Sequence, residues 1–189
     1  AIVLAAGWME MLSPAEIAAE LALEGGQGPG LDLLETELHD VPERQRSIRA
    51  VFDYSWNLLT EPEREVFQGL SVFRGGFTRQ AAAQVTGATL RELRGLLDRS
   101  LLQRAATGRY EVHELLRQYA AEKLDGVPAA GEAARERHSA YYVAALQQWA
   151  ADLKGPRQEA ALADMEAEVE NARAAWRWEP WAWCTARRA

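Results

Sequence analysis

The sequence predicts a mainly helical protein that contains one β-hairpin. Ser13, Thr60 and Thr89 are each followed three positions later by glutamate, which is the capping-box pattern of helix starts. Apolar residues recur at three- and four-residue steps along the chain, and this period changes to short strand patterns only around residues 101–113. The composition agrees with a globular fold, because 48% of the 189 residues are hydrophobic and 26% are charged.

Composition and charge argue against several classes of protein. Cys184 is the only cysteine, so no internal disulfide can form, and one cysteine with three separated histidines does not match the ligand spacing of a zinc site. The formal net charge is −7 and the charges of residues 60–125 nearly balance, unlike a protein that binds nucleic acid through many phosphate contacts. The apolar run at residues 1–7 lacks a basic flank and is too short to span a bilayer, so we expect a cytoplasmic protein without a membrane partner.

Residues 1–42 are predicted to form a small helical segment. Ser13 and the proline after it mark the start of a helix that should reach about residue 24. The glycine-rich residues 25–30 are expected to be a flexible linker, because no Lys-Ser/Thr pair follows them as in a phosphate-binding loop. Leucines within residues 31–38 suggest one further short helix before Pro42.

Four helix patterns follow between residues 43 and 100. The first spans about residues 43–59, and its apolar residues are spread so widely that we expect burial on more than one side. Thr60, Thr78 and Thr89 then begin three short helices. The last of these should bury a single stripe formed by Leu90, Leu93, Leu97 and Leu101.

A hairpin is predicted after these helices. Residues 101–104 and 110–113 are strand candidates, and Gly108 in the loop between them can adopt a positive φ. Three helices followed by a hairpin is the order of a winged helix-turn-helix domain. Together with a further helix from Glu114, this predicts a winged-helix domain over residues 43–125.

Residues 132–178 are predicted to form a tetratricopeptide-like antiparallel helix pair, after a linker at residues 128–131 and with a turn at Gly155-Pro156. The first helix should present one face composed of His138, Tyr141, Tyr142, Ala145, Trp149 and Leu153. The second should present a stripe composed of Leu162, Met165, Val169, Ala172 and Trp176. The residues expected to face solvent opposite that stripe are Glu166, Glu168 and Glu170.

The outward apolar positions of this pair predict further association. We expect Tyr142, Leu146 and Trp149 to be left uncovered, and therefore expect self-association, a protein partner or downstream helical repeats. Residues 179–189 form an atypical Trp-rich tail, which we interpret as the product of an altered reading frame or a truncated gene model.

Four segments, taken in order, resemble one family. They are RQRSIRA at residues 44–50, YSWNLL at 54–59, LSVFRGGF at 70–77 and YEVHELLRQYA at 110–120. Over residues 1–176 the chain resembles bacterial STAND-type signal-transduction ATPases of the NB-ARC kind, which occur in LuxR-type and SARP-type transcriptional regulators. The resemblance implies a parent protein in which an upstream P-loop domain binds ATP or ADP with Mg and precedes the small helical segment, the winged helix and the repeats.

The resemblance also implies a role for one histidine. Val112-His113-Glu114 stands where the family has a Met-His-Asp motif, and it departs from that motif at both flanking residues. By this resemblance His113 would bind the phosphate of the nucleotide and hold the ADP-bound resting state closed. The alternative is that His113 only caps a backbone group at a strand-to-helix junction.

We expect the chain itself not to be an enzyme. It contains no Gly-x-x-x-x-Gly-Lys-Ser/Thr loop and no nucleophile elbow, so it should hold no cofactor of its own. The predicted function is the regulatory switch and scaffold portion of a nucleotide-dependent transcriptional regulator. The alternative is a DNA-binding winged helix that uses Arg91, Arg94 and Arg99, although Asp98 on the same face would repel phosphate and we do not expect DNA contact.

Overall fold

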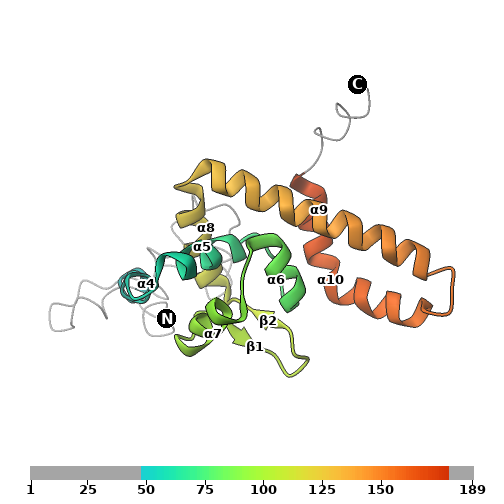
Figure 1. Cartoon of the computed structure of the whole chain (residues 1–189), viewed down its shortest axis with the longest axis horizontal. Coiled ribbons are helices and arrows are strands. Elements are labelled where there is room, and N and C mark those ends of the chain that lie inside the picture. The colour runs from blue at the N-terminus through green and yellow to red at the C-terminus, as the bar shows by residue number, and fades with distance from the viewer. Residues whose placement is uncertain (1–47, 179–189) are drawn as a thin grey trace, which may run out of the picture.

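The computed structural model describes residues 48–178, which are mainly helical and include one two-stranded antiparallel sheet (Figure 1). The mainly helical fold class is therefore confirmed. The predicted helix after Ser13, the glycine-rich linker, the small helical segment and the Trp-rich tail lie outside the described residues.

The first seven described elements follow the order expected for a winged helix. They are α4 (Ile48–Asn57), α5 (Glu61–Leu70), α6 (Arg79–Thr86), α7 (Leu90–Asp98), β1 (Gln103–Arg104), β2 (Tyr110–Glu111) and α8 (Glu114–Asp125). The hairpin pairs Gln103 with Glu111 and Arg104 with Tyr110. Phe77 extends this sheet, because it exchanges backbone hydrogen bonds with Tyr110 at 2.9 and 2.8 Å. We refer to the hairpin and its loop, residues 103–111, as the wing.

The local signals that begin these helices act as predicted. The backbone N–H of Thr60 donates to Glu63 Oε2 at 2.8 Å, and that of Thr89 donates to Glu92 Oε2 at the same distance. The hydroxyl of Thr78 accepts a hydrogen bond from the N–H of Ala81 at 3.1 Å. Each contact satisfies a backbone or hydroxyl group that would otherwise lack a partner at the helix end.

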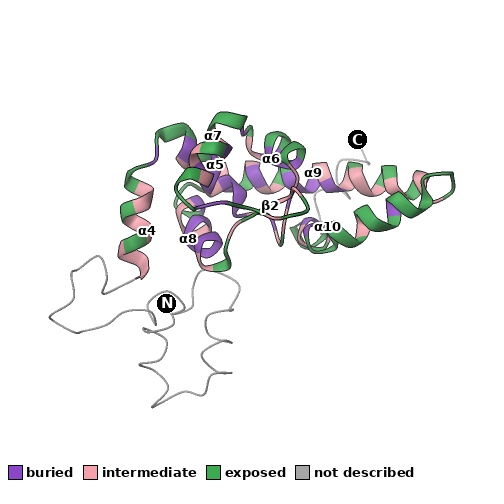
Figure 2. Cartoon of the chain, turned by 90° about the horizontal axis from the view of Figure 1, so that it is seen from below, coloured by how far each residue is buried: buried purple, intermediate pink, exposed green. Residues whose placement is uncertain are grey.

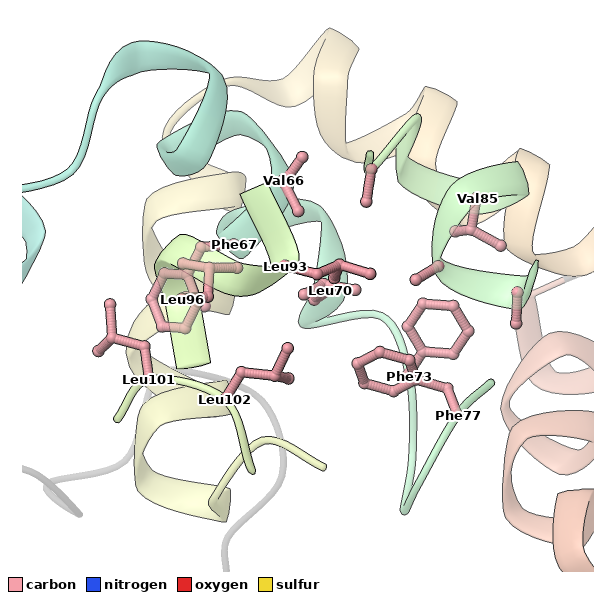
Figure 3. Packing of buried hydrophobic residues seen from close by; sticks show 14 of the residues in the cluster. Val66, Phe67, Leu70, Phe73, Phe77, Val85, Leu93, Leu96, Leu101 and Leu102 are labelled. Atoms are coloured by element: carbon pink, nitrogen blue, oxygen red, sulfur yellow. The ribbon is translucent and has the colours of Figure 1, made fainter. Parts of the chain in front are cut away.

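The hydrophobic core lies among α5, α6, α7 and the residues flanking the wing (Figure 3). Phe73 and Phe77 stack there with ring centroids 4.5 Å apart. The predicted stripe of α7 is partly wrong, because Leu96 is buried in place of Leu97 and the side chain of Leu90 is 59% exposed. Leu101 belongs to a separate segment, because Ser100, with a φ of 58°, turns the chain after α7 before Leu101 and Leu102 enter the core.

The prediction for α4 is also wrong, because this helix contains no fully buried residue (Figure 2). Phe52 and Trp56 pack edge-on against Tyr119 of α8, with ring centroids 5.6 and 6.3 Å apart. Val51 and Tyr54, in contrast, are largely exposed. Among the described residues α4 is covered along one side only, so the width of an apolar face does not by itself determine how much of that face is buried.

The last two helices, α9 (Pro128–Asp152) and α10 (Gln158–Trp178), form the predicted antiparallel pair beside the winged helix (Figure 1). The predicted linker at residues 128–131 is wrong, because these residues form the first turn of α9. Pro128 is tolerated there, since the first N–H of a helix needs no helical partner.

Candidate functional site

The exposed side of α7 is the first candidate surface, since α7 directly precedes the hairpin, as the recognition helix does in winged-helix proteins. The three predicted arginines do not act together there. Arg94 Nε lies 2.8 Å from Asp98 Oδ1 within the helix. Arg99 Nη1 turns toward α5 and contacts Glu63 Oε1 at 3.1 Å. The guanidinium of Arg91 makes no hydrogen bond or ion pair with residues 48–178, so two of the three cations are engaged within the chain.

The Arg99–Glu63 pair also belongs to the cap of α5. Burial opposes ionisation of Glu63, but hydrogen bonds from Thr60 and the charge of Arg99 outweigh this cost and lower the pKa of the carboxyl. Arg99 therefore joins α5 to the end of α7 and is not directed at an external ligand.

His113 lies directly after the wing, at the N-cap of α8. Its Nδ1 accepts a hydrogen bond from the N–H of Leu115 at 3.3 Å, and the side chain is exposed. The backbone-capping alternative is thus the contact that His113 makes in this structure. The phosphate-binding role concerns a nucleotide domain outside these residues and is still a prediction.

A buried polar cluster joins the wing to the helix pair. We call Arg109, Tyr142, Glu168 and Asn171 the wing junction. Glu168 is 7% exposed, and its carboxylate receives Arg109 Nη1 at 2.7 Å, the hydroxyl of Tyr142 at 2.8 Å and Nδ2 of Asn171 at 2.9 Å. Three donors from the wing, α9 and α10 therefore converge on one carboxylate.

Asn171 extends the wing junction to the loop that follows α5. Its Oδ1 accepts the backbone N–H of Arg74 at 2.7 Å, and its Nδ2 also donates to the carbonyl oxygen of Gly76 at 2.9 Å. Arg109 Nη2 donates to the same carbonyl oxygen. Backbone groups of the loop after α5 are thereby satisfied by Asn171 of α10, which fixes this loop against the helix pair.

Electrostatics favour the charged form of the ion pair in this cluster. The hydrogen bond from Arg109 to Glu168 raises the pKa of the guanidinium despite partial burial. Burial together with the neighbouring Glu168 carboxylate raises the pKa of the Tyr142 hydroxyl, which stays protonated and donates its hydrogen bond.

Two sequence-based predictions fail at the wing junction. Glu168 was expected to face solvent but is buried, because Arg109 reaches it from a segment 59 residues away in the chain. Tyr142 was expected to be left uncovered but is fully buried. Ala161 and Ala175 lie seven residues to either side of Glu168 and are buried too, so this repeat of small residues was the available signal for the packed side of α10.

The predicted apolar stripe of α10 is therefore on the wrong face. Leu162, Val169 and Trp176 are 52%, 40% and 79% exposed, respectively. The packed side of α10 instead carries Glu168 and Asn171 of the wing junction together with the buried Ala161 and Ala175. These polar and small residues occupy the positions next to the rest of the protein, so the large apolar residues lie on the opposite side.

Within residues 48–178, no helix combines the length and apolar character needed to cross a lipid bilayer.

Two curated mycobacterial proteins align with most of the chain. Both carry the name "Putative HTH-type transcriptional regulator", one from Mycobacterium tuberculosis strain H37Rv and one from Mycobacterium bovis. Each is 35% identical over 196 residues, and the alignment covers 94% of this chain but 20% of the relative. The chain thus spans about a fifth of the length of these relatives. No protein-family model matches the chain, and no solved structure matches it significantly.

Proposed function

We propose that the chain is a regulatory part of a bacterial transcriptional regulator, in which the winged helix is an internal switch and the helix pair is a scaffold. The names of the mycobacterial relatives support a role in transcriptional regulation. The observation that carries the proposal is the ion pair between Arg109 and Glu168, because it commits the wing to a contact inside the protein. A wing held in this way can transmit a change of position to the helix pair.

The proposed signal is the nucleotide state of an upstream P-loop domain that binds ATP or ADP with Mg. His113 would donate a hydrogen bond to the nucleotide phosphate in the closed, ADP-bound state. Its exposure at the end of the wing and at the start of α8 supports this assignment. The chain itself would hold no cofactor and catalyse no reaction, since one histidine cannot replace a phosphate-binding loop.

The size of the effect follows from the bond that is lost. A hydrogen bond to a charged group contributes about 1.5 to 3 kcal/mol, which corresponds to a roughly ten- to hundredfold change in the ratio of closed to open states. In the longer regulator, His113→Ala should accelerate ADP release by this factor and raise signal-independent transcription.

The matched variant is His113→Asn. Asparagine caps helices well, so this variant keeps the N-cap of α8 but does not supply the imidazole. The proposal requires both variants to release ADP faster than the wild type. If only His113→Ala does so, the effect comes from the lost cap, and the switch role of His113 is refuted.

DNA binding by α7 is the second candidate function. It is favoured by the exposure of Arg91 and by the position of α7 ahead of the wing. Titration of the chain with duplex DNA at two salt concentrations separates the two functions. Binding that weakens steeply with salt would support DNA contact, and absence of binding at low salt would eliminate it.

The exposed apolar face of α10 indicates the position of a further partner. We propose that downstream helical repeats cover Leu162, Val169 and Trp176, because a tetratricopeptide-like pair stacks on its neighbour through such a face. Self-association through this face is the competing outcome, and light scattering of the chain with and without the following segment distinguishes the two.

A further inference from the structure

A pocket of about 270 Å³ lies where α8, α9 and α10 meet the loop after α5. Among the residues that the structure describes, five arginines and one carboxylate, Glu170, line it. The arginines come from four separate segments of the chain: Arg74, Arg117, Arg135, Arg173 and Arg177. Cations from four segments converge on one hollow.

Two of these guanidinium groups meet at a single atom. Arg74 Nη1 and Arg117 Nη1 both donate to the carbonyl oxygen of Ser71, at 3.2 and 3.3 Å. Arg117 is 6% exposed, so water screens this pair of like charges poorly. The Glu114 carboxylate lies against both cations, because it pairs with Arg117 and its pKa is lowered by the charge of Arg74 as well. The fold thus gathers two cations around one carboxylate.

A second pair of like charges lies on α10. Arg173 and Arg177 are four residues apart and therefore lie on the same face of the helix, an arrangement that destabilises an isolated helix. Each of three carboxylates engages one arginine of the pocket: Glu114 pairs with Arg117, Asp125 with Arg135 and Glu170 with Arg173. These contacts use part of the donor capacity, since a guanidinium carries five N–H donors.

His138 lies in the wall of the same pocket. It is 3% exposed, and its Nε2 has no hydrogen-bond partner among residues 48–178. This nitrogen is shielded from the solvent-accessible space of the pocket, so the arginines would make the contacts to an anion there.

We propose that this pocket binds a small phosphate-bearing anion. The planar fork of each arginine matches the oxygens of a phosphate group, and several arginines together match its double charge. The pocket is compact and concave, which suits a phosphate or pyrophosphate group better than the extended backbone of a nucleic acid. The site is made of residues other than His113, although Arg117 lies one helical turn after it and donates its N–H to the His113 carbonyl oxygen at 2.9 Å. The proposal does not depend on the proposed nucleotide switch.

The probes are inorganic phosphate, pyrophosphate and sulfate, titrated into the full chain at constant ionic strength. We expect saturable heat of binding in calorimetry and a rise in the melting temperature with phosphate or pyrophosphate, because a ligand that binds the folded state stabilises it. Comparison of phosphate with pyrophosphate distinguishes a free monophosphate or phosphate ester from a diphosphate group. Heat that increases without saturation would overturn the proposal.

The test variant combines Arg173→Gln and Arg177→Gln. Both side chains are exposed, so the fold should tolerate the change. The matched control is Arg157→Gln, which removes an exposed arginine at the turn between α9 and α10. We expect the double variant to weaken binding at least tenfold and the control to leave it unchanged. Equal weakening in both, or competition by single-stranded RNA as effective as that by pyrophosphate, would refute a specific pocket for a small anion.

Discussion

Arg109, at the end of the wing loop, and Glu168, in the middle of α10, form an ion pair with 2.7 Å between Nη1 and Oε1. Their side chains are 19% and 8% exposed, so the pair is largely withdrawn from water. A buried pair adds little net stability compared with apolar packing, but removing one partner is costly because the other charge is left buried and unpaired. The pair therefore specifies where the wing docks on the helix pair.

The first prediction concerns this contact. Glu168→Gln should lower the free energy of unfolding by about 3 kcal/mol, since it leaves Arg109 without its counter-charge in a buried site. Urea denaturation of the chain measures the change. The control is Glu166→Gln on the exposed side of α10, which should change stability by less than about 0.5 kcal/mol.

A double-mutant cycle isolates the pair from the rest of the wing junction. Arg109→Met combined with Glu168→Gln should be less destabilising than the sum of the two single changes, because neither residue then leaves a buried charge. Strict additivity would show that the two side chains do not interact and that the wing is not fixed by this contact.

The second prediction concerns pH. Burial lowers the pKa of His138 to about 4, and the charge of Arg74 acts in the same direction. The Asn171 side chain and the Glu168 carboxylate favour the protonated ring but do not outweigh burial. The unfolded chain therefore binds the proton more readily between about pH 6.5 and 4. Stability should be highest above pH 6.5 and should fall by about 3 kcal/mol as the pH drops to 4, because each pKa unit corresponds to about 1.4 kcal/mol.

Urea denaturation at pH 7 and pH 5 tests this prediction. His138→Gln removes the titrating group, so the variant should lose less stability than the wild type between these two pH values. An unchanged difference would assign the acid sensitivity to other groups. Carboxylates with a lowered pKa, such as Glu63, lose their contribution at lower pH, which makes the interval above pH 5 the most specific for His138.

Local signals made much of the fold predictable. Thr60, Thr78 and Thr89 begin helices because a side-chain oxygen close in sequence suffices to complete a helix end. Gly108 adopts a φ of 82° in the loop of the wing because glycine adopts a positive φ without a steric penalty. These features depend on a few neighbouring residues, and the sequence contains all the information they need.

The wing junction was not predictable in the same way. The seven-residue spacing of Ala161, Glu168 and Ala175 marks the packed side of α10. The partners that bury the Glu168 charge, Arg109 and Tyr142, lie 59 and 26 residues away in the chain and cannot be read from α10. The exposed face of α4 was not predictable for the same reason. Hydrophobic spacing shows which side of a helix could be buried, but it does not show which other segment covers that side. Predictions from the sequence failed where charge pairs and distant segments determine the packing.

The third prediction separates the two roles of His113 in the isolated chain. His113→Ala should lower stability by about 0.5 to 1 kcal/mol through loss of the N-cap, and His113→Asn should have little effect. Thermal unfolding of the two variants measures both values. Equal destabilisation by both substitutions would mean that the imidazole makes a contact beyond the cap, and the ADP-release comparison would then need a different control.

The last prediction concerns α7 and DNA. Arg94 is paired with Asp98, and Arg99 with Glu63, so we expect the chain to show no duplex binding at low salt. Asp98→Asn provides the critical comparison, because it removes a negative charge from the exposed side of α7 and releases Arg94 without altering the core.

If α7 is a DNA-binding helix, this variant should bind duplex DNA more tightly than the wild type, and Arg91→Ala should reverse the gain. If the winged helix is an internal switch, neither the wild type nor Asp98→Asn should bind in a fluorescence anisotropy titration, since removing one repulsive carboxylate does not create the several phosphate contacts that duplex binding requires. Salt-sensitive binding by Asp98→Asn that Arg91→Ala abolishes would therefore overturn the switch assignment for this domain.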